Sequence, residues 1–376
     1  MNKLRVLTVV GTRPEIIRLS RVMARLEETT DHVLVHTGQN YDFELNQVFF
    51  DDLAVRKPDH FLEVAGGSLA ETIGNIIARV DKVLEARNPD ALLVLGDTNS
   101  CLSVIPAKRR KIPIFHMEAG NRCFDQRVPE ESNRKVVDHL ADINLPYSSH
   151  ARENLLREGI PTDRIIKTGS PMFEVLQSYR SGIEGSGVLQ RLNLVPGDYF
   201  LVSCHREENV DSDVNLPKFV ALLNHLASVH GKRVIVSAHP RTRKRLEAGG
   251  FALEPGVELI KPFGYFDYVK LQEQALVVLS DSGTITEESS ILDFPALNIR
   301  EAHERPEGME EGVVIMTGME IARVEQAIQV LRSAPARAGR KTRLVKDYDA
   351  PQVSETVVRA ILSYVDYVNR FVWRKS

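Results

Sequence analysis

The sequence predicts an α/β protein made of two Rossmann-like domains that face a cleft. Short apolar runs rich in Val, Ile and Leu alternate with longer segments of helical period, and this alternation starts again after residues 182–187. The runs are almost continuously apolar, as expected for parallel strands that helices cover on both faces. A chain of 376 residues is also long enough for two domains of roughly 100–200 residues each.

The first half of the chain predicts one doubly wound parallel sheet. The candidate strands are Leu4–Val10, His32–His36, Ala91–Leu95, Pro113–Met117 and Ile143–Pro146. Between them, the helix Ser68–Arg87 begins with a capping-box pattern at Ser68 and Glu71 and continues with apolar residues at the helical period. This βαβα order predicts a doubly wound parallel sheet.

The second half repeats the pattern. Its candidate strands are Tyr199–Cys204, Arg233–Ala238, Val257–Lys261, Leu276–Ser280 and Pro295–Ile299, and its candidate helices are Leu216–His230, Tyr268–Gln274 and Ile285–Leu292. The segment Pro351–Trp373 has the pattern of one long helix. We therefore expect an N-terminal domain over residues 1–170 and a C-terminal domain over residues 171–350, with the helical segment 351–376 crossing back to the first.

The composition excludes several classes of protein. Lys and Arg number 48 against 51 Asp and Glu, a net charge of −3, which disfavours nucleic acid or an anionic membrane as the main partner. No apolar stretch approaches about 18 residues and the first residues do not resemble a signal peptide, so we expect a cytoplasmic protein without a membrane segment. The three cysteines are far apart and the histidines are scattered, which argues against a disulfide framework and against a metal site.

The residues that follow the predicted strands are the candidates for chemistry, because open α/β sheets bind ligands beyond the carboxyl ends of their strands. Gly11–Glu15 follows the first strand, with Pro14 at the first helical position. Arg13 at this helix start would form an anion site, although a turn with a solvated arginine explains the same residues. The dinucleotide fingerprint GxGxxG and the P-loop pattern are absent from the sequence, which disfavours NAD and ATP.

Three carboxylates form the strongest cluster in the first half. Asp97 and Glu118 follow two successive strands, and Glu130 opens a helix that contains Arg134. Asp97 and Glu130 also suit the ends of helices, whereas Glu118 directly follows an apolar strand, where a buried carboxylate needs a partner or a task. Three carboxylates at one sheet end are what proton transfer to and from carbon requires.

The second half offers groups suited to a phosphate and a ribose. His205 follows its first strand, and Ser282 and Gly283 stand at a helix start, where hydroxyl and backbone N–H groups can bind a phosphate. Glu287, one turn later, could accept ribose hydroxyls. His239 follows the second strand and could equally cap a helix, and residues 300–307, with six ionisable residues in eight, have the composition of a solvated charged loop.

Together these motifs closely resemble one family, the non-hydrolysing UDP-N-acetylglucosamine 2-epimerases. The matching segments are GTRPE (11–15), GDT (96–98), HMEAG (116–120), PEESNR (129–134), HRE (205–207), SDSGTITEE (280–288) and ERPE (304–307). The resemblance implies a fold of the glycosyltransferase-B type, a homodimer, and a UDP-sugar in the interdomain cleft. It also implies a reaction without a cofactor: UDP is eliminated to leave a 2-acetamidoglycal and is added back after a proton reaches the opposite face of C2.

The resemblance assigns roles to individual positions. The catalytic set is Asp97, Glu118, Glu130 and His205, and the substrate- and UDP-binding set is Arg13, Arg18, Arg134, His239, Ser282, Gly283, Glu287 and Arg305. His205 would lie near the diphosphate, Arg13 would contact it, and Arg305 would lie in a loop that closes on the ligand. Which carboxylate is the base and which the acid stays open.

Several positions depart from the common family pattern. Asn121 and Cys123 follow Glu118 where EAGLRT is usual, Arg18 replaces a Lys, Thr284 replaces a Gly, and Asn40 replaces a His. Asn40 falls in a region that helps to bind an effector in some members, which argues against activation by substrate. These variants are similar to the branch that makes UDP-N-acetyl-L-fucosamine for bacterial capsule and O-antigen, whose substrate is a UDP-2-acetamido-2,6-dideoxy-L-hexose.

Three competing functions remain at this stage. The first is interconversion of UDP-N-acetylglucosamine and UDP-N-acetylmannosamine, which would use the same catalytic residues. The second is a glycosyltransferase on the same fold, which would not need three clustered carboxylates. The third is a sugar-nucleotide sensor without catalysis, which the intact Asp97, Glu118, Glu130 and His205 disfavour.

Overall fold

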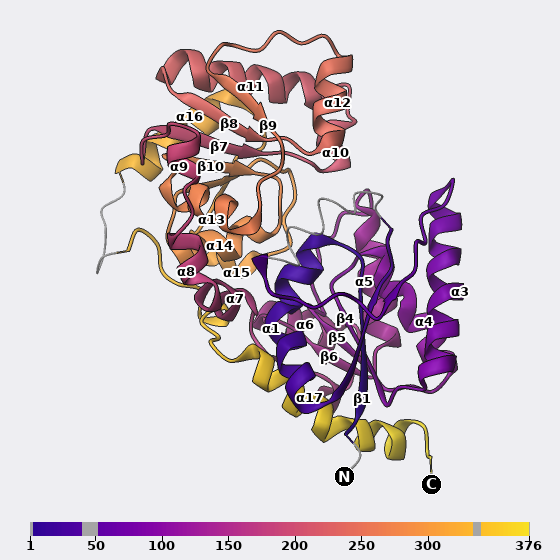
Figure 1. Cartoon of the computed structure of the whole chain (residues 1–376). Helices are drawn as coiled ribbons and strands as arrows, with labels where there is room; N and C mark the ends of the chain where they lie inside the picture. The colour runs from indigo at the N-terminus through magenta and orange to yellow at the C-terminus, as the bar shows by residue number, and fades with distance from the viewer. Residues whose placement is uncertain (1–2, 40–51, 334–339, 376) are drawn as a thin grey trace. The chain divides into compact units, whose positions relative to one another are not determined.

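The computed structural model describes residues 3–39, 52–333 and 340–375 (Figure 1). The chain forms two compact units: Met1–Ser178 together with Asp347–Ser376, and Tyr179–Lys346. No helix within these described ranges is long and apolar enough to cross a membrane.

The first unit contains a six-stranded parallel sheet in the order β3-β2-β1-β4-β5-β6. Its strands are β1 (Arg5–Val10), β2 (Asp31–His36), β3 (His60–Phe61), β4 (Ala91–Leu95), β5 (Ile114–Met117) and β6 (Ile143–Leu145). The order turns back between β1 and β4, which is the switch point where doubly wound sheets bind ligands. Almost every residue of β1, β4 and β5 is buried, which explains why these strands are recognisable as continuous apolar runs.

Helices cover both faces of this sheet. They are α1 (Arg13–Thr29), α3 (Leu69–Arg87), α4 (Val104–Arg109), α5 (Pro129–Leu140), α6 (Ser149–Arg157) and α7 (Met172–Ser178), with short 3-10 turns η1 (Asn99–Ser103) and η2 (Thr162–Arg164). As expected, Ser68 caps α3, its side chain accepting from the backbone N–H of Glu71.

The end of the chain belongs to the first unit. Helix α17 (Val353–Tyr367) continues as a π-helix over Val368–Val372 and packs against α1 (Figure 1), where Arg25 Nε lies 2.8 Å from Glu355 Oε2. The 3-10 turn η3 (Lys346–Tyr348) precedes it. Apolar residues at the helical period of this segment, such as Val357 and Ile361, are fully buried.

The second unit repeats the plan with a six-stranded parallel sheet in the order β12-β11-β10-β7-β8-β9. Its strands are β7 (Tyr199–Ser203), β8 (Arg233–Ser237), β9 (Val257–Ile260), β10 (Val277–Ser280), β11 (Ala296–Asn298) and β12 (Ile315–Met316). Its helices are α8 (Arg180–Glu184), α9 (Val188–Arg191), α10 (Glu207–Val210), α11 (Asn215–His230), α12 (Pro240–Ala248), α13 (Tyr265–Gln274), α14 (Thr284–Leu292), α15 (Pro306–Glu310) and α16 (Ile321–Ser333).

The predicted fold class is confirmed: each unit is a doubly wound, Rossmann-like sheet. The two-residue edge strands β3 and β12 were not expected, because two residues carry no periodicity. Of residues 182–187, expected as a Gly/Ser-containing stretch between the halves, 182–184 form the end of helix α8, in which Ile183 is buried. Asn40, the position connected with effector binding, lies outside the described residues.

Candidate active site

Glu118 occupies a strained turn at the carboxyl end of β5. Its φ of 63° lies in the left-handed region, which is costly for a residue with a side chain, and Gly120 follows with a φ of 81°. The carboxylate forms an ion pair with Arg18 of α1 through Oε2 and accepts from Asn121 Nδ2 at 3.1 Å through Oε1. Arg18, expected to bind the substrate, is only 3% exposed, and its ion pair is with this carboxylate.

The turn is held in this shape by Asp138 of α5. This fully buried carboxylate accepts from the backbone N–H of Gly120 at 3.1 Å and lies 2.9 Å from His116 Nδ1 and 2.8 Å from Arg122 Nη1. Arg122 also forms an ion pair with Glu158, with its Nη2 2.6 Å from Oε2. The buried charges are thus paired with one another, as low-dielectric surroundings require.

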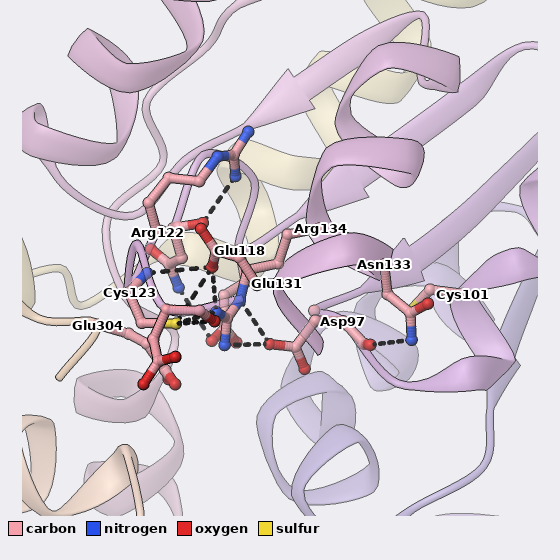
Figure 2. Close-up of polar contacts among 12 residues, drawn as sticks. Asp97, Cys101, Glu118, Arg122, Cys123, Glu131, Asn133, Arg134 and Glu304 are labelled. Atoms are coloured by element: carbon pink, nitrogen blue, oxygen red, sulfur yellow. Dashed lines mark hydrogen bonds and ion pairs between the residues drawn. The ribbon is translucent and has the colours of Figure 1, made fainter. Parts of the chain in front are cut away.

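Asp97 lies in the neighbouring turn, after β4, and is bound by α5 (Figure 2). Arg134 approaches Asp97 Oδ2 with Nε at 2.8 Å and Nη2 at 2.7 Å, and Asn133 Nδ2 donates to the backbone carbonyl of Asp97 at 2.9 Å. The side chain of Asp97 stays 24% exposed. The two turns adjoin, since a Cβ placed on Gly96 would lie 3.8 Å from Glu118 Oε2.

The two adjacent glutamates at the start of α5 differ in burial. Glu130, the predicted catalytic residue, lies in the first turn of α5 and is partly exposed, whereas Glu131 is fully buried. Burial alone would raise the pKa of Glu131, but the backbone N–H of Cys123 and the guanidinium of Arg134 bind the carboxylate and lower the pKa below its ordinary value.

The turn after β1 contains a further buried carboxylate, Glu15. Its Oε2 accepts from the backbone N–H groups of Gly11 and Thr12 at 2.8 and 2.7 Å, which closes a capping box on α1, and its Oε1 accepts from Thr98 Oγ1 at 2.8 Å. Burial raises the pKa of Glu15 to about 7, although each of these hydrogen bonds opposes the shift. Arg13 is the first residue of α1 and is partly exposed, so the helix start predicted here is present.

In the second unit, His205 follows β7 and pairs with Asp281, which follows β10. His205 Nδ1 lies 3.0 Å from Asp281 Oδ1. The buried carboxylate also accepts from the backbone N–H of Arg206 at 2.9 Å and from Asn209 Nδ2 at 3.1 Å. Burial alone would raise the pKa of Asp281, but His205 and these hydrogen bonds hold it well below its ordinary range. The His205 side chain is 47% exposed, so its outer nitrogen can reach a ligand.

The remaining predicted binding residues of this unit lie near the start of α14. Ser282 and Gly283 directly precede the helix and are partly exposed, with Ser282 Oγ 3.0 Å from Thr284 Oγ1. Glu287 is fully buried and lies 3.3 Å from Nη2 of Arg305, which is itself only 3% exposed.

In the second unit, His239 and residues 300–307 are both held by contacts within the protein. His239 caps helix α12, because its Nδ1 accepts from the backbone N–H of Arg241 at 3.3 Å, and its role in substrate binding stays a prediction. The expectation of a solvated loop over residues 300–307 is wrong. Arg300, Glu304 and Arg305 are buried and form internal ion pairs, such as Arg300 Nη1 to Glu304 Oε1 at 3.0 Å.

The structure therefore brings Arg18, Asp97, Glu118 and Arg134 together in the first unit and His205 with the α14 start in the second. Sequence reasoning did not assign the fully buried partners Glu15, Glu131, Asp138 and Asp281. A Thr-x-x-Glu pattern at Thr12 and Glu15 and the i, i+3 spacing of Glu131 and Arg134 were available signals, whereas Asp138 and Asp281 bind residues distant in sequence. Among the described residues, no group of three or more His, Cys, Asp or Glu side chains is placed to hold a metal ion.

Two doubly wound sheets and a carboxylate-rich sheet edge define an α/β enzyme of the glycosyltransferase-B type. The sequence profile of the UDP-N-acetylglucosamine 2-epimerase family matches residues 24–362. The chain therefore belongs to this family and is an isomerase of the non-hydrolysing type.

Individual proteins support this assignment. The structure of UDP-N-acetylglucosamine 2-epimerase from Rickettsia bellii has a TM-score of 0.92 at 52% identity, covering 100% of both chains. Methanocaldococcus jannaschii UDP-GlcNAc 2-epimerase, solved in complex with UDP-GlcNAc and UDP, has a TM-score of 0.89 at 32% identity, covering 96% of this chain and all of the other. The UDP-2,3-diacetamido-2,3-dideoxy-D-glucuronate 2-epimerase of Pseudomonas aeruginosa is 32% identical over 84% of this chain and 88% of its own.

Proposed function

We propose that this enzyme inverts C2 of a UDP-linked 2-acetamido sugar, and that its substrate is a UDP-2-acetamido-2,6-dideoxy-L-hexose. The observation that carries the reaction is the pairing of Asp97 and Glu118 with the buried arginines Arg134 and Arg18 at one sheet edge. A guanidinium beside a carboxylate favours its ionised form, which is the form that accepts a proton.

In the proposed reaction a carboxylate of the first unit removes the C2 proton while the bond from C1 to the UDP oxygen breaks. The products of this half-reaction are a 2-acetamidoglycal and UDP. UDP then adds back to C1 as a proton is delivered to the opposite face of C2, so atoms and charge balance without an oxidant. Asp97, Glu118 and Glu130 are the proposed acid and base groups.

The second unit would stabilise the departing UDP. His205, oriented by Asp281, can donate to a diphosphate oxygen, and Ser282 and Gly283 offer hydroxyl and backbone N–H groups at the start of α14. Glu287 is the proposed acceptor for ribose hydroxyls. Arg13 at the start of α1 is proposed as a further diphosphate contact.

The L-sugar is proposed from the sequence variants near the carboxylates; in the structure one of these contacts a proposed acid/base group and another contacts the neighbouring buried carboxylate of Glu131. Asn121 donates to Glu118, and Cys123 Sγ lies 3.3 Å from Glu131 Oε2. UDP-N-acetylglucosamine is the second candidate, favoured by the 52% identity with the Rickettsia bellii protein.

Proton NMR in D₂O tests both the reaction and the substrate. The enzyme is incubated separately with UDP-2-acetamido-2,6-dideoxy-L-talose and with UDP-N-acetylglucosamine. Deuterium at C2 of the L-sugar, with a new epimer, is the expected result. Exchange only in the glucosamine nucleotide would select the second candidate, and exchange in neither would refute the proposed reaction for these sugars.

A variant at Glu118 connects the reaction to the site. Glu118→Gln is expected to abolish C2 exchange while UDP still binds in calorimetry, because the carboxylate acts at the sugar and not at the nucleotide. Glu85→Gln, a change at a carboxylate of the same unit that is 71% exposed, is the control and should keep full activity. Substantial exchange by Glu118→Gln would remove Glu118 from the mechanism.

A further inference from the structure

Arg134 is surrounded by protein carboxylates. Its side chain is 3% exposed, and three of its nitrogens have carboxylate partners: Nε and Nη2 lie 2.8 and 2.7 Å from Asp97 Oδ2, and Nη1 lies 2.8 Å from Glu131 Oε2 (Figure 2). A guanidinium has five N–H donors in a rigid plane, so contacts at three nitrogens fix the orientation of the whole group. A residue whose purpose was to bind substrate phosphates would instead direct its donors toward the ligand.

Glu131 is fixed just as firmly on the other side of Arg134. Its Oε2 accepts from the backbone N–H of Cys123 at 3.1 Å and lies 3.3 Å from Cys123 Sγ, while its Oε1 accepts from the backbone N–H of Phe124 at 3.3 Å. The carboxylate is fully buried. A buried anion held by two backbone donors and a guanidinium cannot turn without breaking several bonds at once.

The positive charge of Arg134 is compensated by two carboxylates, Glu131 and Asp97. Glu131 compensates the buried cation of Arg134, so the arginine does not depend on Asp97 as its only counterion. Asp97 is the one carboxylate of the three-residue chain that remains partly exposed, at 24% of its side chain. The charged groups of Glu131 and Arg134 are thus bound within the protein, whereas the Asp97 carboxylate is partly open to solvent.

We infer that Glu131 and Arg134 are positioning residues that hold the Asp97 carboxylate, ionised and in a fixed direction, for proton transfer at C2. This inference rests on the proposed epimerase reaction and revises the expectation that Arg134 binds the substrate. Helix α5 carries both residues, three positions apart, so they share one helix face. Asn133, on the same helix, donates from Nδ2 to the backbone carbonyl of Asp97 and so fixes the backbone of that residue.

The test separates positioning from substrate binding. Arg134→Gln is expected to lower kcat by about 100-fold, the effect of misplacing a reacting group, while KM and the calorimetric Kd for UDP stay within about twofold. Without the cation, the acid limb of the kcat–pH profile is expected to move to higher pH, because Asp97 then ionises less readily. Arg134→Lys keeps the positive charge but loses the planar guanidinium with its several donors. The acid limb of this variant should therefore remain near that of the native enzyme although kcat falls.

Two further measurements exclude a purely structural effect. Guanidinium at millimolar concentration should restore part of the activity of Arg134→Ala. The thermal unfolding temperature and the affinity for UDP, measured for each variant, show whether it is folded. The control is Arg110→Gln, another arginine of this unit that pairs with a carboxylate, at 2.5 Å from Asp81, and its activity should not change. Glu131→Gln should reproduce the loss of kcat, since Arg134 would lose its second support.

The outcomes distinguish the inference from the function on which it rests. An unchanged kcat in Arg134→Gln, with KM either unchanged or raised at least tenfold, would overturn the positioning role. C2 exchange by the native enzyme would still support the epimerase reaction in that case. An acid limb that does not move in Arg134→Gln would also overturn it. A native enzyme that exchanges C2 of neither sugar nucleotide would refute the proposed function, and the inference with it.

Discussion

Replacement of Glu15 by Gln tests whether burial or hydrogen bonding controls the pKa of a carboxylate at this sheet edge. Glu15 is 1% exposed, and its pKa is raised from 4.5 to about 7 by burial. Between these values the folded chain keeps a proton that the unfolded chain releases, so rising pH favours unfolding. A difference of about 2.5 pH units at 1.36 kcal/mol per unit corresponds to about 3.4 kcal/mol, of which about 2.5 kcal/mol falls between pH 5 and pH 8.

The assay can be restricted to the unit that contains Glu15. Trp373 is the single tryptophan of the chain and lies in the first unit, with its ring centroid 5.0 Å from Lys108 Nζ, so its fluorescence follows unfolding of that unit. Urea unfolding at pH 5 and pH 8 gives the free energy of unfolding for the native chain and for Glu15→Gln. The native chain should lose about 2.5 kcal/mol more than the variant over this interval.

The control is Glu71→Gln, because Glu71 occupies the same third position of helix α3 but is exposed to water. Its change in stability with pH should follow that of the native chain. If the native chain and Glu15→Gln instead differ by a constant amount from pH 5 to pH 8, the bonds from Gly11, Thr12 and Thr98 outweigh burial, and Glu15 is ionised throughout.

Two other substitutions test the support of the site. Asp281→Asn replaces an acceptor by a donor that faces backbone N–H groups, so the second unit should lose about 3 kcal/mol at neutral pH. Because the pKa of Asp281 is depressed, this advantage of the native chain should be lost as pH falls below about 4; equal hydrogen-exchange protection of β7 in both chains would contradict it. Gly120→Ala should destabilise the first unit by about 2–4 kcal/mol, since its Cβ would lie 2.2 Å from the Ala151 carbonyl at a φ of 81°; an unchanged melting temperature would refute this.

The sheets were predictable because their strands are buried on both faces. Ala91–Leu95 and Tyr199–Ser203 are almost entirely apolar, and the structure ends the predicted strands within one or two residues of these runs. Helix α13 starts at Tyr265, three residues before the predicted start, because Gly264 serves as its N-cap and the helix begins with aromatic residues. Helix ends that depend on such local packing have no periodic signal.

The candidate site was predictable where chemistry follows topology. Asp97 and Glu118 directly follow neighbouring parallel strands, so their turns had to meet at one edge of the sheet. What the sequence could not show is which charges pair. Asp281 binds His205 from 76 positions away, and the pairing is visible only once β7 and β10 lie side by side.

Helix α5 explains why the charge pairs of the first unit depend on one another. Its buried residues include Glu131, Arg134 and Asp138, at a spacing that places them on one face. Arg134 reaches the turn that carries Asp97, and Asp138 reaches the turn that carries Glu118. A face that would normally be apolar is therefore charged: Glu131 pairs with Arg134 on the helix itself, and Arg134 and Asp138 pair with the loops of the candidate site. This arrangement ties the geometry of both carboxylates to a single helix, so a shift of α5 would move Asp97 and Glu118 together.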